Sequence, residues 1–420
     1  MDFDWSDIDS RSVALARPRG REDEVLLSAV RAIVQDVREN GWSALASQSL
    51  RIDGAEPKRV AIAPFAALAR ETLPSDALEA IRMAARNIET FHSQTLPRHT
   101  EVIPYPGLSV AKHWRAIGMA GLYVPGGKAP LFSTLLMLAI PARVAGVRSL
   151  TVVTPPRADG GLDIAVAFAA ECCGIDAIWT VGGAQAIAAL AFGAGDIPAV
   201  DLICGPGNAW VAAAKAIVSS LPGGPGIDLP AGPSELMVIA DDSADPAIVA
   251  ADLLSQAEHD EQAQVLLVSP SAAIIAAVEQ EFSRQSADIG GTFAPARFIR
   301  CADQAEAVAI ANLYGPEHLS LACCDAASLV PSVVNAGAVF VGHQAAESFG
   351  DYLAGSSHVL PTDGAARFTG GVSTMTFMKA MTVQRISPRA AAQLAAPAAI
   401  LARLEGLEAH ARAAEARNVA

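Results

Sequence analysis

From Gly118 onward, short apolar runs alternate with glycine turns and alanine-rich segments of helical length, and this alternation constrains the fold more than any other feature. The predicted strands of a first series are Gly121–Val124, Ser149–Val153, Ala177–Val181 and Val200–Cys204. The predicted helices are Leu131–Val144, Leu162–Cys172, Ala184–Phe192 and Trp210–Ser219. Strands that alternate with helices of about ten residues indicate a parallel sheet covered on both faces. The sequence therefore predicts one α/β domain of a nucleotide-binding type.

A second α/β series follows the first. Its predicted strands are Leu236–Ile239, Gln264–Val268, Arg297–Arg300, Leu319–Ala322 and Ala338–Val341, and its predicted helices are Pro246–Gln256, Ala272–Ser283 and Ala302–Leu313. No clear sequence repeat relates the two series, so the pattern of elements alone indicates duplication. We expect two α/β/α units in tandem.

Both ends of the chain are predicted to be helical. Apolar residues recur at helical spacing within Glu22–Arg51 and Asp76–Phe91, so the first ~115 residues are expected to be largely helical. The last fifty or so residues, with Met375–Met381 and Pro397–Arg417, are rich in Ala, Leu and Arg and predict a helical tail. Such a tail is too short for its own core and should pack on something larger.

Composition excludes several classes of partner. The chain has 420 residues, 52% of them hydrophobic, and a formal net charge of −14, so it has a large core but opposes nucleic-acid binding. The longest mostly apolar run, Leu131–Ile140, is about half of what a membrane-spanning helix needs. Met1–Trp5 is acidic and shows neither a secretory signal nor a transit peptide, so we expect a cytoplasmic protein. The six cysteines lack metal-binding spacing and are expected to be reduced and mostly buried.

Three glycine turns are candidates for phosphate binding. Gly205-Pro206-Gly207-Asn208 lies between a predicted strand and a predicted helix, where helix N-terminal amides bind anions. Turns at Val124–Gly127 and Val181–Gln185 follow two further strands, and the carboxyl ends of parallel strands converge on one crevice. Trp210 replaces the third glycine of a dinucleotide fingerprint, so a plain strand-to-helix turn is an equally good interpretation of the first motif.

A few polar residues are candidates for chemistry. Gln256 and His259 share one face at a helix end and suit a metal, although a solvated helix terminus explains them as well. Glu317-His318 is an acid-base pair on a turn that leads into an apolar strand. Asp351 and His358 flank a loop of small residues and offer an oxygen and a nitrogen ligand. The common hydrolase, P-loop and deaminase motifs are absent. The residues by themselves predict an α/β enzyme with a nucleotide crevice and a single-metal site.

The chain resembles the histidinol dehydrogenases over nearly its whole length. The motifs that carry the resemblance, in order, are Gly121–Gly127 (GLYVPGG), Val181–Leu190 (VGGAQAIAAL), Gly205–Asn208 (GPGN), Pro230–Glu235 (PAGPSE), Ser255–His259 (SQAEH), Tyr314–Leu319 (YGPEHL), Gly350–Tyr352 (GDY), His358–Thr362 (HVLPT) and Glu405–His410 (EGLEAH).

The resemblance implies an intertwined, zinc- and NAD-dependent homodimer that oxidises L-histidinol through L-histidinal to L-histidine. It implies zinc ligands Gln256, His259 and Asp351, with His410 from the other subunit, which would explain the tail. Glu317 would activate water and His318 would take the hydroxyl proton. The implied substrate-binding residues are Ser234, Gln256, His259, His318, Asp351, His358, Glu405 and His410, and those implied for NAD are Tyr123, Gln185 and Asn208.

Together, pattern and resemblance predict an α/β fold of two Rossmann-like units with helical extensions at both ends. The expected divisions are an N-terminal arm (1–20), a substrate and zinc domain (21–117 with 235–372), an NAD-binding domain (118–234) and a C-terminal tail (373–420) that contributes to the partner's active site.

Departures from the family pattern leave the identity of the substrate open. Ser356-Ser357 precedes His358, and Thr376–Ala380 stands for a pattern of Asp, Phe, Lys and Arg, so a relative acting on another polar primary alcohol, such as a sulfonated diol, is an alternative. A non-catalytic nucleotide-binding or assembly protein would require loss of Glu317-His318 or of the zinc residues, and all of these are present.

Overall fold

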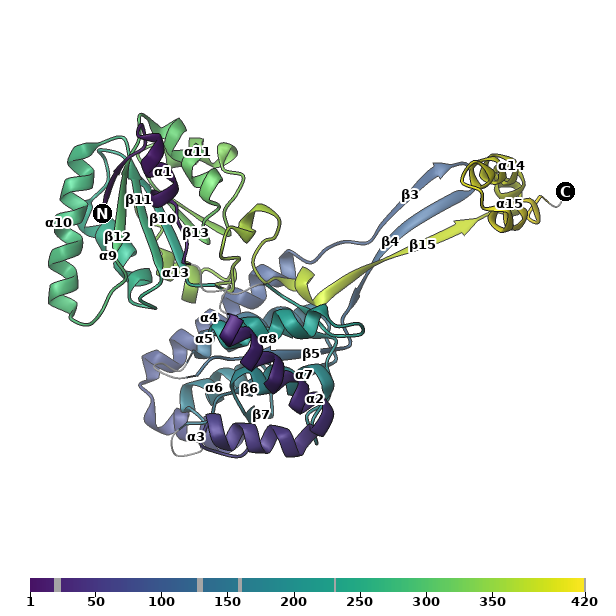
Figure 1. The fold of residues 1–420 in the computed structure, drawn as a ribbon, viewed down its shortest axis with the longest axis horizontal. Helices are drawn as coiled ribbons and strands as arrows, with labels where there is room; N and C mark the ends of the chain where they lie inside the picture. Colours follow the sequence, from purple (N-terminus) through teal and green to yellow (C-terminus); the bar gives the residue numbers. More distant parts are fainter. Residues whose placement is uncertain (19–23, 127–130, 158–160, 230–231, 419–420) are drawn as a thin grey trace. The chain divides into compact units, whose positions relative to one another are not determined.

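A computed structural model describes residues 1–18, 24–126, 131–157, 161–229 and 232–418 (Figure 1). Gly127, Pro230 and Ala231 of the quoted motifs lie outside these described residues. The chain divides into a first unit of residues 1–94 and 118–377 and a second unit of residues 95–117 and 378–420. The first unit contains two six-stranded sheets and the second a three-stranded sheet, among the residues described.

The first sheet has the order β2-β7-β6-β5-β8-β9. Its strands are β2 (Lys58–Ala61), β5 (Met119–Tyr123), β6 (Ser149–Thr154), β7 (Ala177–Thr180), β8 (Leu202–Cys204) and β9 (Gly226–Ile227). Every neighbouring pair is parallel except β2 with β7. The helices that follow its strands are α5 (Phe132–Ala145), α6 (Ile164–Cys172), α7 (Gly183–Phe192) and α8 (Ala209–Ser220). The predicted alternation of strand and helix is confirmed here.

The N-terminal helices pack on this first sheet, whereas the expected division assigned 21–117 to the substrate domain. The helices are α2 (Glu24–Ile52), α3 (Ala63–Thr72) and α4 (Ser75–Gln94). Val30, Ile33, Val34 and Val37 of α2 share an apolar cluster with α7 and α8, and α3 packs on α6. Helical spacing shows that α2 has an apolar face but does not show which sheet covers it, and this explains the difference.

The second sheet has the order β1-β12-β11-β10-β13-β14, and all its pairs are parallel. Its strands are β1 (Asp2–Asp4), β10 (Glu235–Ala240), β11 (Gln264–Ser269), β12 (Ala296–Arg300), β13 (His318–Ala322) and β14 (Ala338–Val341). Helices α9 (Pro246–Ala257) and α10 (Ala272–Ile289) cover one face (Figure 1). Helices α1 (Ile8–Ala14) and α11 (Gln304–Tyr314) cover the other, and the short α13 (Glu347–Tyr352) follows β14.

The second unit corrects part of the helical prediction. Its antiparallel sheet, ordered β15-β4-β3, consists of β3 (Thr100–Tyr105), β4 (Leu108–Ala116) and β15 (Met378–Ile386). The expected helices over residues 100–115 and Met375–Met381 are therefore wrong. Strands β3 and β15 are mostly exposed and β4 is mostly half-buried, so they lack the apolar alternation that marks a strand with one buried face. The predicted tail helix is present as α14 (Pro388–Leu404) and α15 (Glu408–Glu415).

The described residues bear on two expectations from composition, which concern membrane-spanning helices and the cysteines. No helix among the described residues is long and apolar enough to cross a membrane. All six cysteines are free thiols, and Cys173, Cys204, Cys301 and Cys323 are buried, as predicted.

Candidate active site

Polar side chains gather at the amino edge of the second sheet. Glu317 and His318 lie at the start of β13, beside Glu235 at the start of β10. The last turn of α9 brings Gln256 to this edge, because the helix runs back from the carboxyl end of β10. Asp351 reaches the same place from α13. The first-unit residues predicted for catalysis and metal binding thus come from elements that are far apart in the sequence.

His318 is held through one ring nitrogen and has a carboxylate near the other. Its Nδ1 lies 3.1 Å from the carbonyl oxygen of Glu235 and its Nε2 lies 3.6 Å from Asp351 Oδ1. The ring stacks on Phe340 at a centroid distance of 5.9 Å. Because a carbonyl oxygen only accepts hydrogen bonds, Nδ1 carries the hydrogen, and in the neutral ring Nε2 keeps its lone pair. Nε2 is therefore the atom that can take a proton.

Charge around His318 outweighs its burial. Burial alone lowers the pKa of the imidazole, but the carboxylates of Glu347, Glu317 and Asp351 raise it to about 10. Glu317 is itself only 6% exposed, and its Oε2 accepts a hydrogen bond of 2.9 Å from the N–H of Glu235. Burial raises the pKa of Glu317 to about 7. A carboxylate with a pKa near neutrality is suited to remove a proton from water.

Glu347 belongs to this site and was missed in the sequence. Its carboxyl is buried and accepts a hydrogen bond from Gln256 Nε2, and burial raises its pKa well above the ordinary value. Ligating atoms of His318, Glu347 and Asp351 lie within 4.8 Å of one another. Glu347 precedes Asp351 by four residues on α13, so the two carboxylates share a helix face. The four-residue spacing between Glu347 and Asp351 was the feature of the sequence that could have identified Glu347.

Asp351 is surrounded by imidazoles. The pKa of its carboxyl lies below the ordinary value, because His318, His358 and His259 together outweigh the burial that would raise it. His358 Nδ1 lies 2.9 Å from the carbonyl oxygen of Asp351, and His358 Nε2 lies 3.2 Å from Thr134 Oγ1. His259 is exposed and follows the end of α9. The structure thus places His358 against Asp351, and a joint action of His259 with this carboxylate stays a prediction.

Unsatisfied acceptors test whether a cation suits this cluster. Within the described chain, Gln256 Oε1, His318 Nε2 and Glu347 Oε2 are buried without a hydrogen-bond partner. Each accepts hydrogen bonds or ligates a metal in at least one of its protonation states, and buried groups of this kind are normally satisfied. Imidazole nitrogen and side-chain oxygen are ligands that zinc accepts. The residues present therefore fit a zinc ion.

A second cluster lies at the carboxyl edge of the first sheet. Tyr123 ends β5, and its hydroxyl oxygen accepts a 3.2 Å bond from Gly183 N–H, while burial raises the pKa of the phenol to about 12. Gln185 is fully buried, and its Nε2 donates to Asp53 Oδ2 at 3.1 Å. Asn208 is exposed and caps α8 through bonds to the N–H groups of residues 210 and 211.

The turns that carry these residues converge. A Cβ on Gly205, which has φ +130°, would lie 2.0 Å from the carbonyl oxygen of Tyr123, so the ends of β5 and β8 touch. A Cβ on Gly182 would meet Pro155, which follows β6, at 2.7 Å. The predicted turns thus lie close together at one edge of the sheet, and a crevice for a nucleotide there stays a prediction.

Three predicted residues are not drawn into either cluster. Ser234 is half-buried and precedes Glu235, and its carbonyl oxygen accepts a hydrogen bond from Gln264 N–H at 2.8 Å. Glu405 and His410 are exposed and belong to the second unit, at the end of α14 and within α15. Their place in a site stays a prediction.

Comparison with known proteins agrees with this geometry. The family model for histidinol dehydrogenase matches residues 16–418. The chain belongs to the histidinol dehydrogenase family. A histidinol dehydrogenase of Xanthomonas campestris pv. campestris is 44% identical, covering 99% of this chain and 98% of that protein. One from Legionella pneumophila is 40% identical over 98% of this chain and 97% of its own length.

A solved structure supports the same membership. The crystal structure of histidinol dehydrogenase from Elizabethkingia anophelis superposes with a TM-score of 0.93 at 35% identity, covering 99% of this chain and 97% of that one. The predicted family, the α/β fold class with parallel sheets and the prediction of an oxidoreductase are confirmed for this member of the histidinol dehydrogenase family.

Proposed function

We propose that this chain oxidises L-histidinol through L-histidinal to L-histidine, with two NAD as oxidants and one zinc ion per subunit. The observation that carries the proposal is the buried Glu317-His318 pair beside Gln256 and Asp351, in a chain of this family. Oxidising an alcohol to an acid removes four electrons, so a base for the hydroxyl proton and an activator for water are both needed. The pair supplies one of each.

The chain's own residues divide the work as follows. His318 Nε2, in the neutral form of the ring, takes the proton of the substrate hydroxyl while the bond from Nδ1 to the Glu235 carbonyl oxygen fixes the ring. A zinc ion bound among the carboxylates that raise the pKa of His318 would favour this neutral form. Glu317 removes a proton from the water that adds to the aldehyde, which creates the carbinol for the second oxidation. His358 and Ser234 hold the substrate. Tyr123, Gln185 and Asn208 line the site for NAD, and Asp53 keeps the Gln185 amide in place.

Gln256, His259 and Asp351 would hold zinc, with His410 of the partner subunit. Zinc, when bound, fixes the amino alcohol as a ligand and so orients its carbinol. Glu405 of the partner subunit would face the substrate's ammonium group. We therefore propose a homodimer in which the second unit of each chain completes the other's site.

The decisive assay incubates zinc-loaded protein with NAD and L-histidinol. We expect two NADH and one L-histidine per L-histidinol, loss of turnover on chelation and its return with zinc. A sulfonated diol, tested in parallel, should be oxidised far more slowly. Turnover of the diol without turnover of L-histidinol would overturn the assignment of the substrate, and no turnover of either would overturn the proposed function.

Replacing His259 by asparagine should lower zinc content. Loss of a direct ligand is expected to weaken zinc binding at least as much as the roughly 10- to 100-fold that loss of an outer-shell partner costs. Metal analysis after dialysis measures this without any activity. His343→Asn is the matched control, because His343 contacts Ser243 beyond the opposite end of β10. Equal zinc content in the two variants would exclude His259 as a ligand.

A further inference from the structure

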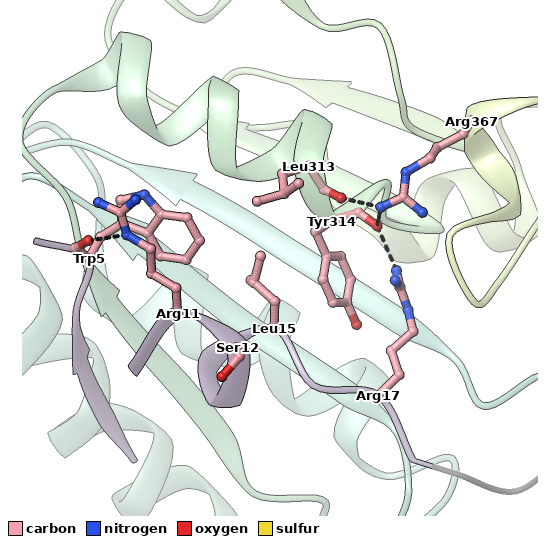
Figure 2. A pocket seen from close by; sticks show the side chains of 8 residues that line it. All are labelled: Trp5, Arg11, Ser12, Leu15, Arg17, Leu313, Tyr314 and Arg367. Atoms are coloured by element: carbon pink, nitrogen blue, oxygen red, sulfur yellow. Dashed lines mark hydrogen bonds between the residues drawn. The ribbon is translucent and has the colours of Figure 1, made fainter. Parts of the chain in front are cut away.

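The N-terminal arm, residues 1–18, packs on the second sheet, and Arg17 lies near the end of the arm. The arm adds β1 to the sheet edge beside β12 and continues through α1. Arg17 then stacks on the Tyr314 ring, 3.8 Å from its centroid, and Nη2 donates to the Tyr314 carbonyl oxygen at 2.9 Å (Figure 2). The guanidinium also forms a fork on Glu235, with Nε to Oε1 at 2.5 Å and Nη2 to Oε2 at 2.9 Å. Such a two-point bond fixes the direction as well as the position of a carboxylate.

Glu235 in turn holds both members of the acid-base pair with its main chain. Its N–H donates to Glu317 Oε2 at 2.9 Å, and its carbonyl oxygen accepts from His318 Nδ1 at 3.1 Å. One residue of β10 therefore orients both side chains, through groups that cannot turn without moving the strand. Within the described chain, Arg17 forms no hydrogen bond or ion pair with Glu317 or His318.

The carboxylate of Glu235 depends on this partner. Its side chain is only 1% exposed, and within the described part of the chain it accepts, besides the bonds from Arg17, a hydrogen bond from Asp363 N–H at 3.0 Å. A buried carboxylate that loses its cation is strongly unfavourable, and moving toward water relieves it. The start of β10 would then shift, and the bonds to Glu317 and His318 would shift with it.

We infer that Arg17 is a positioning residue, which acts through Glu235 to set the orientation of Glu317 and His318. The inference rests on the proposed function for its kinetic consequence, but not for its structural one. By this inference the N-terminal arm contributes to proton transfer through Glu235, without a hydrogen bond from Arg17 to Glu317 or His318.

Neighbouring arginines provide a control. Arg11 and Arg367 line the same cavity of about 300 Å³ as Arg17 (Figure 2). Among the described residues, neither forms a hydrogen bond or an ion pair with Glu235. Arg11 Nε donates to the Trp5 carbonyl oxygen at 2.7 Å, and its guanidinium lies 5.0 Å from the Trp5 ring centroid. Arg11→Met therefore removes a similar stacked guanidinium from the same arm while leaving Glu235 paired.

The kinetic test compares Arg17→Met, Arg17→Lys and Arg11→Met. In Arg17→Met we expect kcat for L-histidinol to fall by about 10- to 100-fold, the effect of a small misplacement of reacting groups, with little change in the KM for NAD. Arg17→Lys should recover part of the loss, and Arg11→Met should stay within about twofold. In a Glu235→Gln background, Arg17→Met should add little, because both substitutions break the same link. Independent, multiplying effects would contradict action through Glu235.

A second readout needs no substrate. With ¹⁵N-labelled histidine, the Nδ1–H proton of His318, assigned through His318→Asn, should be protected from exchange in the unmodified protein and in Arg11→Met. In folded Arg17→Met this signal should shift or be lost. An unchanged signal in Arg17→Met would overturn the inference even if L-histidinol is not the substrate. If the signal shifts as expected but the unmodified protein does not oxidise L-histidinol, only the proposed function is overturned.

Discussion

Replacing Glu317 by glutamine is expected to slow the oxidation of L-histidinal by about 10²- to 10⁴-fold, the usual contribution of a general base. Glutamine keeps an oxygen that accepts the bond from Glu235 N–H, so the geometry should persist while the ability to take a proton is lost. The first oxidation, in which His318 is the base, should be less affected. Single-turnover assays that start from L-histidinol and from L-histidinal separate the two steps.

The rate of the aldehyde step should also depend on pH. Glu317 takes a proton only while it is ionised, and burial raises its pKa to about 7. The rate of the aldehyde step should therefore rise with pH up to about 7 and level off above it, and Glu317→Gln should lose this rise. His343→Asn serves again as the control that keeps both steps. A glutamine variant that converts L-histidinal at the unmodified rate would assign water activation to another group.

The alternation of strands and helices was readable from sequence because each parallel strand is buried on both faces and therefore forms a continuous apolar run. Strands β10 and β11, which are buried at every position, were predicted to within a residue or two. Strands β3, β4 and β15 were not, because β3 and β15 expose most of their residues and β4 pairs with β15 across more than 260 positions of sequence. The residue pattern within a short segment does not reveal pairing between strands that are so far apart in the sequence.

The candidate site was predicted unevenly for a related reason. Glu317, His318 and Asp351 stand in recognisable motifs, and the structure brings them together. Glu347 stands one helical turn from a motif and was overlooked. The contribution of Glu235 is made by its peptide groups, which every residue has, so no residue type could reveal it. Glu405 and His410 of the second unit are expected to act in the site of a partner chain. Residue patterns within one sequence do not show contacts between chains.

Lys215→Met is expected to destabilise the protein by about 3–5 kcal/mol, the cost of leaving one member of a buried ion pair without its partner. Lys215 Nζ contacts Asp228 Oδ1 and donates to the Gly205 carbonyl oxygen at 2.9 Å, while Asp228 Oδ2 accepts from Gly205 N–H at 2.7 Å. Both side chains are almost fully buried. The pair thus holds the main chain of Gly205 from both sides, at the turn where no Cβ can be tolerated against Tyr123.

Urea unfolding followed by circular dichroism measures the loss, and the exposed pair Arg70–Glu171 provides the matched control. Its side chains are 44% and 40% exposed, so Arg70→Met should cost less than about 1 kcal/mol. Lys215→Met combined with Asp228→Leu removes the stranded charge and should recover much of the stability. That double variant should still bind NAD more weakly, because Gly205 has lost both of its anchors. If Lys215→Met were no less stable than Arg70→Met, the buried pair would not be what fixes the turn at Gly205.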